Sequence, residues 1–347
     1  ARRQPQVPAG VRMSADELII AVDGGNSKTD VLLLGTDGPV LASVRGAGSS
    51  PHQLGLGPAI QVVDDLVDRT WLAAGLGPRN GSSAAVAAVF MAGADLPSEE
   101  VALADAVAAR GWAKQNHVAN DVFAVLWAAT GTGHGVAVTV GAGVNCVGAA
   151  PSGRRAWFPA LGEITGDWGG GPDIGMAALG AGVRSEDGRG APTVLARTVA
   201  AYFGFSTALE VAVAIHQGSL DAARVVELPP LVVNAAEAGD AEALAIMRRQ
   251  GSEVTRLAIA ALHQLGMEDS PVQIALGGSV LASSRSILLD DIASSIRAEA
   301  PKAETSLCTT RPVLGAALAG LSISGASSVA ETRLRASLDE GSVGAVA

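Results

Sequence analysis

Two segments of this chain share one pattern: an apolar run, a glycine turn, and a second apolar run. Leu18–Val22 leads into the turn Asp23–Asp30, and Val136–Val140 leads through Gly141-Ala142-Gly143 into Val144–Gly148. Short apolar runs bounded by glycine are typical of buried β-strands. Glycine also lets the backbone turn tightly and approach a ligand closely. The repeated hairpin predicts two lobes that each open with the same structural element.

The remaining segments predict an α/β protein, and a length of 347 residues suggests two domains. Ligands of such proteins bind in the cleft between the lobes, where we expect this one. Strands are expected at Val31–Gly35, Val40–Arg45, Ala84–Phe90, His117–Ala119, Val272–Leu276 and Leu307–Thr309. Helices are expected at Gly57–Ala74, Glu99–Arg110, Asp121 to about Ala129, Ile174–Leu265, Ser283–Ala298 and Pro312–Leu321. Ser98 is the expected N-cap of the second helix. The long stretch Ile174–Leu265 is expected to break near Gly188, Gly204 and Pro229-Pro230.

Composition excludes several classes of partner. The net charge is −10 and no Lys/Arg cluster occurs, so we expect no nucleic acid partner. No run of about 18 apolar residues occurs, so we expect no membrane span. Cys146 and Cys308 are far apart and form no CxxC, which favours a reducing, cytoplasmic location over a disulfide framework. Met13 could be the true start, with residues 1–12 as an upstream extension.

The first glycine turn has the composition of a phosphate site. Gly24 and Gly25 remove Cβ clashes, Ser27 and Thr29 offer hydroxyl donors, and Lys28 adds a positive charge. Asp23 ends the strand, where a carboxylate can hold hydrated Mg²⁺. An ordinary hairpin turn would explain the same residues. The second turn, Gly141–Gly143, could clamp phosphates from the other side, or it could be a structural turn of a duplicated fold.

Further polar residues follow other strands. Asn120-Asp121 is either a helix N-cap or a carboxylate that orients an attacking hydroxyl. The segment Leu161–Gly171 is a polar, glycine-rich loop in which Glu163 and Asp167 could bind sugar hydroxyls. Trp157 or Trp168 could lie against a sugar ring, or fill a core. Gly277-Gly278 would allow close approach of a nucleotide base or ribose.

Together these segments resemble the BadF/BadG/BcrA/BcrD-type ATPase family, within the actin-like, sugar kinase and Hsp70 superfamily, which includes N-acetylglucosamine and glucosamine kinases. The resemblance spans roughly residues 17 to 321. The matching stretches are AVDGGNSKTDVLL, GSSPHQLG, VANDVFAVLWAA, VTVGAGVNCVG, ALGEITGDWGGGPDIGMAAL, VRSEDGRGAPTVL, IALGGSVL and RPVLGAALAG.

The resemblance implies two ribonuclease-H-like lobes around an ATP cleft, with ATP and Mg²⁺ as cofactors and a small sugar as substrate. Expected boundaries are an extension at 1–15, a first lobe at 16–130 joined by the helix 312–322, a second lobe at 131–311, and an Ala/Ser/Gly-rich tail at 323–347, which could be partly mobile. The resemblance leaves open whether the protein forms a homodimer. The implied activity is transfer of the γ-phosphoryl group of ATP to a hydroxyl, O6 of an amino sugar being the expected position.

Residue by residue, the resemblance assigns four groups of positions. Asp23 would hold the metal, and Asp121 would act as base on the sugar hydroxyl. The nucleotide would contact Gly24, Gly25, Ser27, Lys28, Thr29, Gly141, Ala142, Gly143, Gly277 and Gly278. The sugar would contact Ser50, Asn120, Asp121, Leu161, Glu163, Thr165 and Asp167.

Three positions depart from the family pattern. The second phosphate loop usually reads G-T-G or G-S-G, and Ala142 removes that hydroxyl. Ser50 stands where the kinases usually carry a sugar-contacting Asn, and Ala160-Leu161 replaces a familiar Gly-Trp pair. Both latter changes concern the sugar more than the kinase chemistry.

Two other functions remain open from the sequence. One is an ATPase activator of a 2-hydroxyacyl-CoA dehydratase or benzoyl-CoA reductase, in which Cys146 and Cys308 would help to bind a shared iron–sulfur cluster. The other is a nucleotide-dependent regulator without catalysis, which Ala142 favours.

Overall fold

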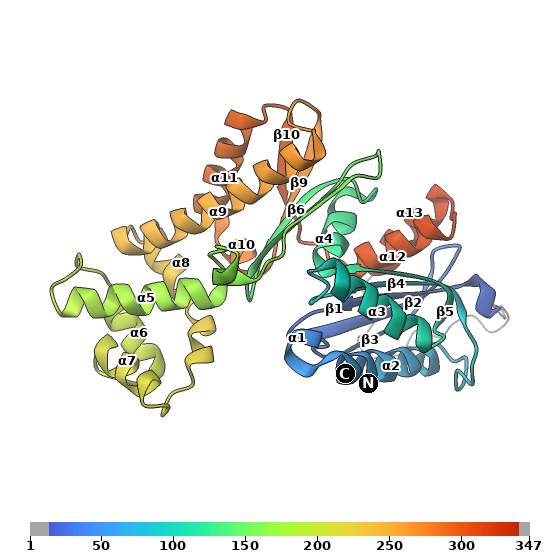
Figure 1. Cartoon of the computed structure of the whole chain (residues 1–347), viewed down its shortest axis with the longest axis horizontal. Coiled ribbons are helices and arrows are strands. Elements are labelled where there is room, and N and C mark those ends of the chain that lie inside the picture. Colours follow the sequence, from blue (N-terminus) through green and yellow to red (C-terminus); the bar gives the residue numbers. More distant parts are fainter. Residues whose placement is uncertain (1–13, 340–347) are drawn as a thin grey trace. The chain divides into compact units, whose positions relative to one another are not determined.

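The computed structural model describes residues 14–339, apart from the side chains of residues 285–287, 338 and 339. The expected extension at 1–12 and the last eight residues of the expected tail lie outside these residues. The described chain forms two compact units. Unit 1 contains residues 14–134 and 310–339, and unit 2 contains residues 135–309 (Figure 1).

Unit 1 is built on a five-stranded mixed sheet in the order β3-β2-β1-β4-β5. Its strands are β1 (Leu18–Gly24), β2 (Lys28–Gly35), β3 (Val40–Ala47), β4 (Ala84–Met91) and β5 (Ala113–Asn120). The first three form an antiparallel meander, whereas β4 and β5 run parallel to β1. β1 is buried along its whole length, as its uninterrupted apolar sequence predicts.

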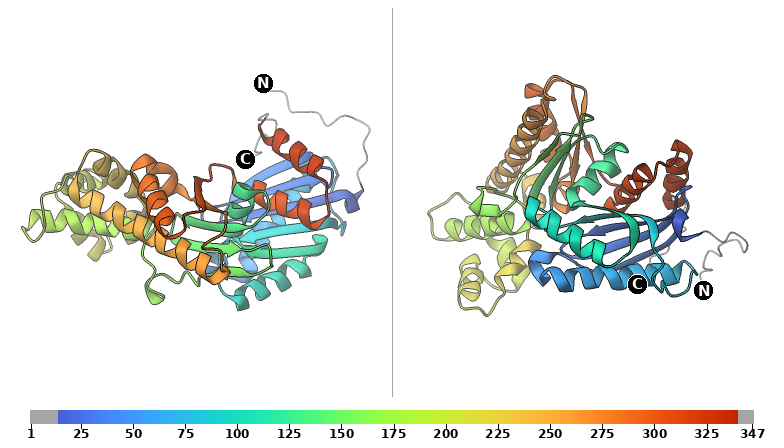
Figure 2. Two further views of the ribbon diagram at one scale, coloured as in Figure 1. Left: turned by 90° about the horizontal axis from the view of Figure 1, so that it is seen from above. Right: turned by 45° about the vertical axis from the view of Figure 1, so that its right-hand side comes forward.

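Helices cover both faces of this sheet. They are α1 (Pro51–Leu54), α2 (Leu56–Ala73), α3 (Pro97–Ala109), α4 (Asp121–Thr130), α12 (Pro312–Ile323) and α13 (Ser328–Asp339), preceded by the 3₁₀ turn η1 (Ala15–Glu17). Leu18, Ile20 and Val22 alternate along β1 and pack in one core with residues of α2 and α3. α4 and α12 lie on the opposite face (Figures 1 and 2). A Cβ on Gly315 of α12 would lie 1.8 Å from the carbonyl oxygen of Ala124, so glycine is required where α12 meets α4.

Unit 2 repeats the sheet plan of unit 1, with the order β10-β9-β6-β7-β8. Its strands are β6 (Gly135–Val140), β7 (Val144–Ala149), β8 (Arg155–Trp157), β9 (Val272–Gly277) and β10 (Ala303–Leu307). Here too three strands form an antiparallel meander and two run parallel to the first. The two-lobed α/β architecture predicted from the repeated hairpin is therefore confirmed.

Unit 2 carries the longer helical insertions. Its helices are α5 (Gly171–Glu186), α6 (Leu195–Phe203), α7 (Ala208–His216), α8 (Pro229–Glu237), α9 (Ala241–Leu265), α10 (Ser279–Ser283) and α11 (Arg285–Glu299), with 3₁₀ turns η2 (Gly162–Ile164) and η3 (Ala222–Glu227). α9 packs against the sheet. α5 to α8 cluster near the N-terminal end of α9 (Figure 1). No single helix within residues 14–339 is long and apolar enough to cross a membrane; α6 and α7 would reach the required length only together, bent by 51°.

The secondary structure departs from the sequence-based expectation at several places. α3 begins at Pro97 with Leu96 as N-cap, so Ser98 is not the cap; proline favours the first helical position, and the Glu99 carboxylate bonds back to the Leu96 N–H. The stretch expected to be helical from Ile174 to Leu265 contains five helices, α5 to α9, and the 3₁₀ turn η3. β8 and α13 were not expected, and β10 ends at Leu307 rather than starting there.

Candidate functional site

The first glycine turn of unit 1 is packed against the loop that follows β3. The Gly25 carbonyl accepts a hydrogen bond from the Ser49 N–H (3.0 Å), and the Thr29 hydroxyl donates to Ser49 Oγ (2.8 Å). A Cβ on Gly24 would lie 2.6 Å from Ser49 Oγ. Lys28 is exposed at the start of β2. The turn is therefore held in one shape by its neighbours, and its lysine remains accessible to an anion.

Two arginines neutralise the carboxylate that lies across the sheet from Asp23. Asp30 pairs with Asp23 across β1 and β2, and it is 1% exposed. It accepts bonds from Arg45 Nε (2.7 Å), Arg45 Nη2 (2.9 Å) and Arg311 Nη2 (3.0 Å). Although burial opposes ionisation, these arginines lower the pKa of Asp30. Arg311 lies at the start of α12, where the chain re-enters unit 1. Its bond to Asp30 therefore links this segment to the strand that follows the first glycine turn.

Three parallel strands bring the predicted base beside the first turn. Gly24 of β1 pairs with Met91 of β4, and Met91 pairs with Asn120 of β5. The carboxyl ends of β1, β4 and β5 therefore meet at one edge of the sheet, where ligands of α/β proteins usually bind. Asp121 follows as the first residue of α4. The Asn120 side chain accepts a bond from the Val122 N–H at 2.9 Å, which confirms its N-cap role.

The carboxyl groups of Asp23 and Asp121 both have a raised pKa, and the charge of Asp23 contributes to that of Asp121. Burial raises the pKa of Asp23 to about 7, and the Asp30 charge adds to this, while Lys28, Arg311 and Arg45 act in the opposite direction. Burial also raises the pKa of Asp121 to about 7, with contributions from the charges of Asp23 and Asp95. Both carboxyl groups thus titrate near neutral pH, which is unusual for aspartate and typical of functional sites.

A second polar chain fixes the orientation of Asn120. Its Nδ2 donates to Asp95 Oδ1 at 2.7 Å. His52 Nδ1 lies 3.9 Å from Asp95 Oδ2, and His52 Nε2 lies 2.8 Å from Glu99 Oε1. Ligand atoms of His52, Asp95 and Glu99 lie within 4.8 Å of one another, a spacing that could hold a metal ion. One oxygen of each carboxylate already binds an N–H group, so the structure itself accounts for the cluster as a brace for Asn120.

In unit 2 the second glycine turn and the Gly277-Gly278 pair lie side by side. β6 and β9 are parallel neighbours, and Thr139 pairs with Gly277. A Cβ on Gly278, whose φ is +92°, would lie 2.2 Å from the Val140 carbonyl oxygen. The turn closes through a bond from the Gly141 N–H to the Gly143 carbonyl (2.9 Å). Two predicted nucleotide segments are thus brought together at one sheet edge, and Ala142 and Gly143 are exposed there.

The end of the predicted sugar loop rests on this same turn. The Gly171 N–H donates to the Gly141 carbonyl at 2.8 Å. A Cβ on Gly170, whose φ is +84°, would lie 2.6 Å from Gly143 Cα. On its other side, the Gly170 N–H donates to Gln250 Oε1 of α9 at 2.9 Å. The backbone of residues 169–171 therefore lies between the phosphate turn and α9.

Within the sugar loop, the Asp167 carboxylate has a fixed partner. The Thr165 hydroxyl donates to Asp167 Oδ2 (2.5 Å), and the Leu161 N–H donates to that hydroxyl (3.1 Å). Glu163 is exposed in η2. Leu161, Thr165 and Asp167 therefore form one hydrogen-bonded group that could present a carboxylate to hydroxyls.

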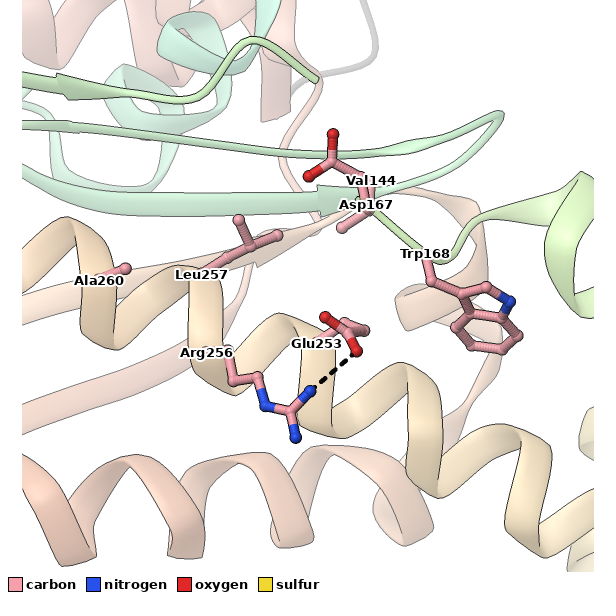
Figure 3. Close-up of a pocket in the computed structure, with 7 residues that line it drawn as sticks. All are labelled: Val144, Asp167, Trp168, Glu253, Arg256, Leu257 and Ala260. Carbon is pink, nitrogen blue, oxygen red and sulfur yellow. Dashed lines mark hydrogen bonds and ion pairs between the residues drawn. The ribbon is translucent and has the colours of Figure 1, made fainter. Parts of the chain in front are cut away.

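Asp167 and Trp168 also border a small pocket against α9, of about 180 Å³. Figure 3 shows the Asp167 carboxylate pointing away from the Arg256–Glu253 pair on α9, with the Trp168 indole on another side of the pocket. The pocket is smaller than the roughly 300–1,000 Å³ typical of small-molecule sites. Trp168 is half-buried and stacks under Arg249, 3.9 Å from its ring centre, whereas Trp157 is 40% exposed.

The structure thus brings together the predicted positions within each unit. Unit 1 groups Asp23, Gly24, Gly25, Ser27, Lys28 and Thr29 with Asn120 and Asp121, and Ser50 is the buried N-cap of α1. Several contributors were not predicted: Asp30, Arg45, Arg311, Asp95 and Gln250. Asp30 and Arg45 lie opposite each other in the expected hairpin, and Arg311 lies in the matched stretch RPVLGAALAG, although none of the three was assigned a role. Asp95 and Gln250 lie outside the matched stretches.

Two sheets with the same strand order, each flanked by helices, define the fold of the actin-like ATPases and sugar kinases. The phosphate-type turns at matching positions agree with that class. More specifically, the chain belongs to the BadF/BadG/BcrA/BcrD ATPase family, which it matches over residues 20–320.

Proteins similar to this chain include a named sugar kinase, a candidate sugar kinase and a transcriptional regulator. The chain is 26% identical over 265 residues to an N-acetylmuramic acid/N-acetylglucosamine kinase of Clostridium acetobutylicum, covering 76% of this chain and 85% of that protein. A crystal structure of a candidate N-acetylglucosamine kinase from Chromobacterium violaceum superposes with a TM-score of 0.70 at 24% identity, covering 88% of this chain and 99% of the other.

A crystal structure of a ROK family transcriptional regulator, a homologue of the Escherichia coli Mlc protein, superposes with a TM-score of 0.58 at 14% identity, covering 93% of this chain and 81% of that one. Structural likeness at these identities establishes the fold alone, because the same fold carries catalysis in some proteins and regulation in others.

Proposed function

We propose that this chain is an ATP-dependent carbohydrate kinase that transfers the γ-phosphoryl group to a hydroxyl of an amino sugar, with O6 of N-acetylglucosamine or glucosamine as the expected acceptor. The observation that carries the proposal is the placement of Asp121. Asp121 is the first residue of α4, at the sheet edge where the first glycine turn also lies. The pKa of its carboxyl group is raised to about 7.

Phosphoryl transfer depends mainly on positioning and on neutralising charge. Asp121 would accept the proton of the sugar hydroxyl, and a base that titrates near neutral pH is well matched to that task. Asn120 would hold a second hydroxyl. Its amide already makes one bond through each polar atom, to the Val122 N–H and to Asp95, and it keeps one N–H and one lone pair for substrate.

Each unit carries candidate nucleotide-binding segments of its own. Lys28 and the exposed backbone at Ala142 and Gly143 suit phosphate oxygens, and Gly277-Gly278 suits the adenosine. Gly24, Gly25 and Gly141 would serve by allowing close approach, because the N–H groups of Gly25 and Gly141 already donate to the Lys28 and Gly143 carbonyls. Asp23 fits a divalent cation, because a buried carboxylate beside another carboxylate gains most from a positive partner. When bound there, Mg²⁺ would neutralise phosphate charge.

The acceptor class is supported by the Thr165–Asp167 pair and by the amino-sugar activity of the Clostridium relative. We place the protein in the cytoplasm, where ATP is supplied. The iron–sulfur activator role is disfavoured by Cys146. Its thiol is fully buried and donates to the Leu257 carbonyl (3.6 Å), and burial raises its pKa, so it is not available as a thiolate ligand for a shared cluster.

A coupled ADP-release assay over hexoses, N-acetylglucosamine, glucosamine and N-acetylmuramic acid tests the proposal. We expect sugar-stimulated turnover in the wild type. Asp121→Asn should lower kcat by at least ~100-fold, while the ADP Kd stays within about twofold, because the variant loses only the base. ATP binding without stimulation by any of these sugars would overturn the kinase function and favour the regulator.

A further inference from the structure

We propose that Gln250 of α9 is a positioning residue that couples the second phosphate turn (Gly141–Gly143) to the predicted sugar loop (Leu161–Gly171). The proposal rests on the proposed function, because it concerns how the nucleotide and sugar segments of that same site communicate. It involves residues of unit 2 alone.

The first step is the contact between Gln250 and the loop. Gln250 is fully buried in the middle of α9, and its Oε1 accepts the Gly170 N–H at 2.9 Å. Its amide is also close to Gly169, where a Cβ would come within 2.5 Å of Oε1 and 2.6 Å of Nε2. A long polar side chain buried in this way is rarely found without a specific partner. Here the partner is a single backbone N–H of the loop.

The second step is the contact between the loop and the turn. Gly170 is pressed against Gly143 on the face opposite its bond to Gln250, and Gly171 donates to the Gly141 carbonyl. Neither Gly169 nor Gly170 could carry a side chain here, since their φ values are +141° and +84°. Any shift of the turn must therefore displace residues 169–171, and Gln250 limits how far they can go.

The third step links this backbone to the sugar side. Asp167 lies two residues before Gly169, and Trp168 between them stacks under Arg249, the neighbour of Gln250. Arg249 and Gln250, which are consecutive in α9, contact the loop at the Trp168 ring and at the Gly170 N–H respectively, and the second contact is the one made to the backbone that packs on the turn. Gln250 Nε2 is buried without a hydrogen-bond partner in the described structure. An unpaired buried donor costs stability, so packing alone does not account for a glutamine at this position.

The test uses Mg²⁺·ADP as the only ligand and Trp168 as the reporter, with the same titration on a Trp168→Phe background to subtract the other tryptophans. In the wild type, we expect ADP to change Trp168 emission and to slow amide exchange in residues 161–171. In Gln250→Met, which keeps a long unbranched side chain without hydrogen bonds, both responses should disappear and the ADP Kd should rise about 3- to 10-fold.

Arg249→Met serves as the matched control on the same helix. It removes the cation above Trp168 but keeps the Gly170 bond, so the ADP Kd and the exchange response should stay close to those of the wild type. The proposal is overturned if Gln250→Met retains the loop response to ADP, or if wild-type residues 161–171 do not respond while ADP binds. The wild-type exchange measurement can refute the coupling by itself even if Gln250→Met fails to fold. Absence of any ADP binding would instead refute the proposed function.

Discussion

Asp23→Asn should make the protein more stable at pH 8 while abolishing its proposed activity. The wild-type carboxyl is 8% exposed and lies opposite Asp30, so its ionisation is unfavourable in the folded protein without a bound cation. Its pKa is higher in the folded state, about 7, than the ordinary value of 3.8. The folded state therefore binds the proton more tightly, and the free energy of unfolding falls as pH rises from about 4 to about 7.

The size of the effect follows from that shift. About three pKa units correspond to roughly 4 kcal/mol at pH 8, at ~1.4 kcal/mol per unit, and to roughly 40% of this at pH 5. Asparagine removes the charge but adds an N–H group that needs a partner, so we halve the gain to about 2 kcal/mol at pH 8 and below about 1 kcal/mol at pH 5. For a domain of this size that is a rise in Tm of about 4–8 °C at pH 8.

Thermal unfolding followed by circular dichroism, at pH 5 and pH 8 with EDTA present, measures this. The matched control is Asp30→Asn, the same change on the cross-strand partner. It should lower stability by about 2 kcal/mol at pH 8, because it breaks the pairs with Arg45 and Arg311, whose partial exposure limits the loss. If Asp23→Asn failed to stabilise at pH 8, or stabilised equally at both pH values, burial of an unfavourable charge would be the wrong account of this site.

Two further outcomes concern the nucleotide and the sugar separately. Ala142→Thr, which supplies the hydroxyl that this turn lacks, should lower the ATP KM about 3- to 10-fold with little effect on the sugar KM; an unchanged ATP KM would mean that the hydroxyl does not reach phosphate. Asp95→Ala, which removes the acceptor that holds the Asn120 amide, should raise the sugar KM about 10-fold and leave the ADP Kd unchanged by titration calorimetry, and a change confined to ADP binding would contradict the brace.

Local patterns predicted the parts of this protein that depend on neighbouring residues. The two hairpins, the buried β1 and the Asn120 cap all follow from sequence because strands and caps are set within a few residues. The ends of the helices between residues 174 and 265 were harder to predict. The breaks at residues 217–221 and 238–240 each include only one glycine and no proline. β8 has three residues, too few for a recognisable alternation.

The residues that position the site depend on contacts between distant parts of the chain. Arg311 reaches Asp30 from 281 positions along the chain, and Gln250 reaches Gly170 from 80 positions away. Gln250 lies outside the matched stretches, and Arg311 opens RPVLGAALAG but was assigned no role. An arginine before a helix or a glutamine within one is ordinarily a solvated side chain. Only the three-dimensional arrangement shows that each one holds a glycine turn, so sequence could propose the groups that contact ligand but not those that position them.

Unit 1 is formed by two separate segments of the chain, and this affects how the chain folds during synthesis. β1 and β4 depend on α12 for one of their faces: Gly320 of α12 lies where a Cβ would come within 2.5 Å of Ile19 Cγ2, with Ala88 close by. During synthesis, α12 emerges about 200 residues after β4, at roughly 5–20 residues per second. Unit 2 is continuous and can fold in that interval, whereas the β1–β4 face lacks α12 for tens of seconds. We therefore expect chaperones to engage a nascent chain chiefly at its first sheet, even though that sheet leaves the ribosome first.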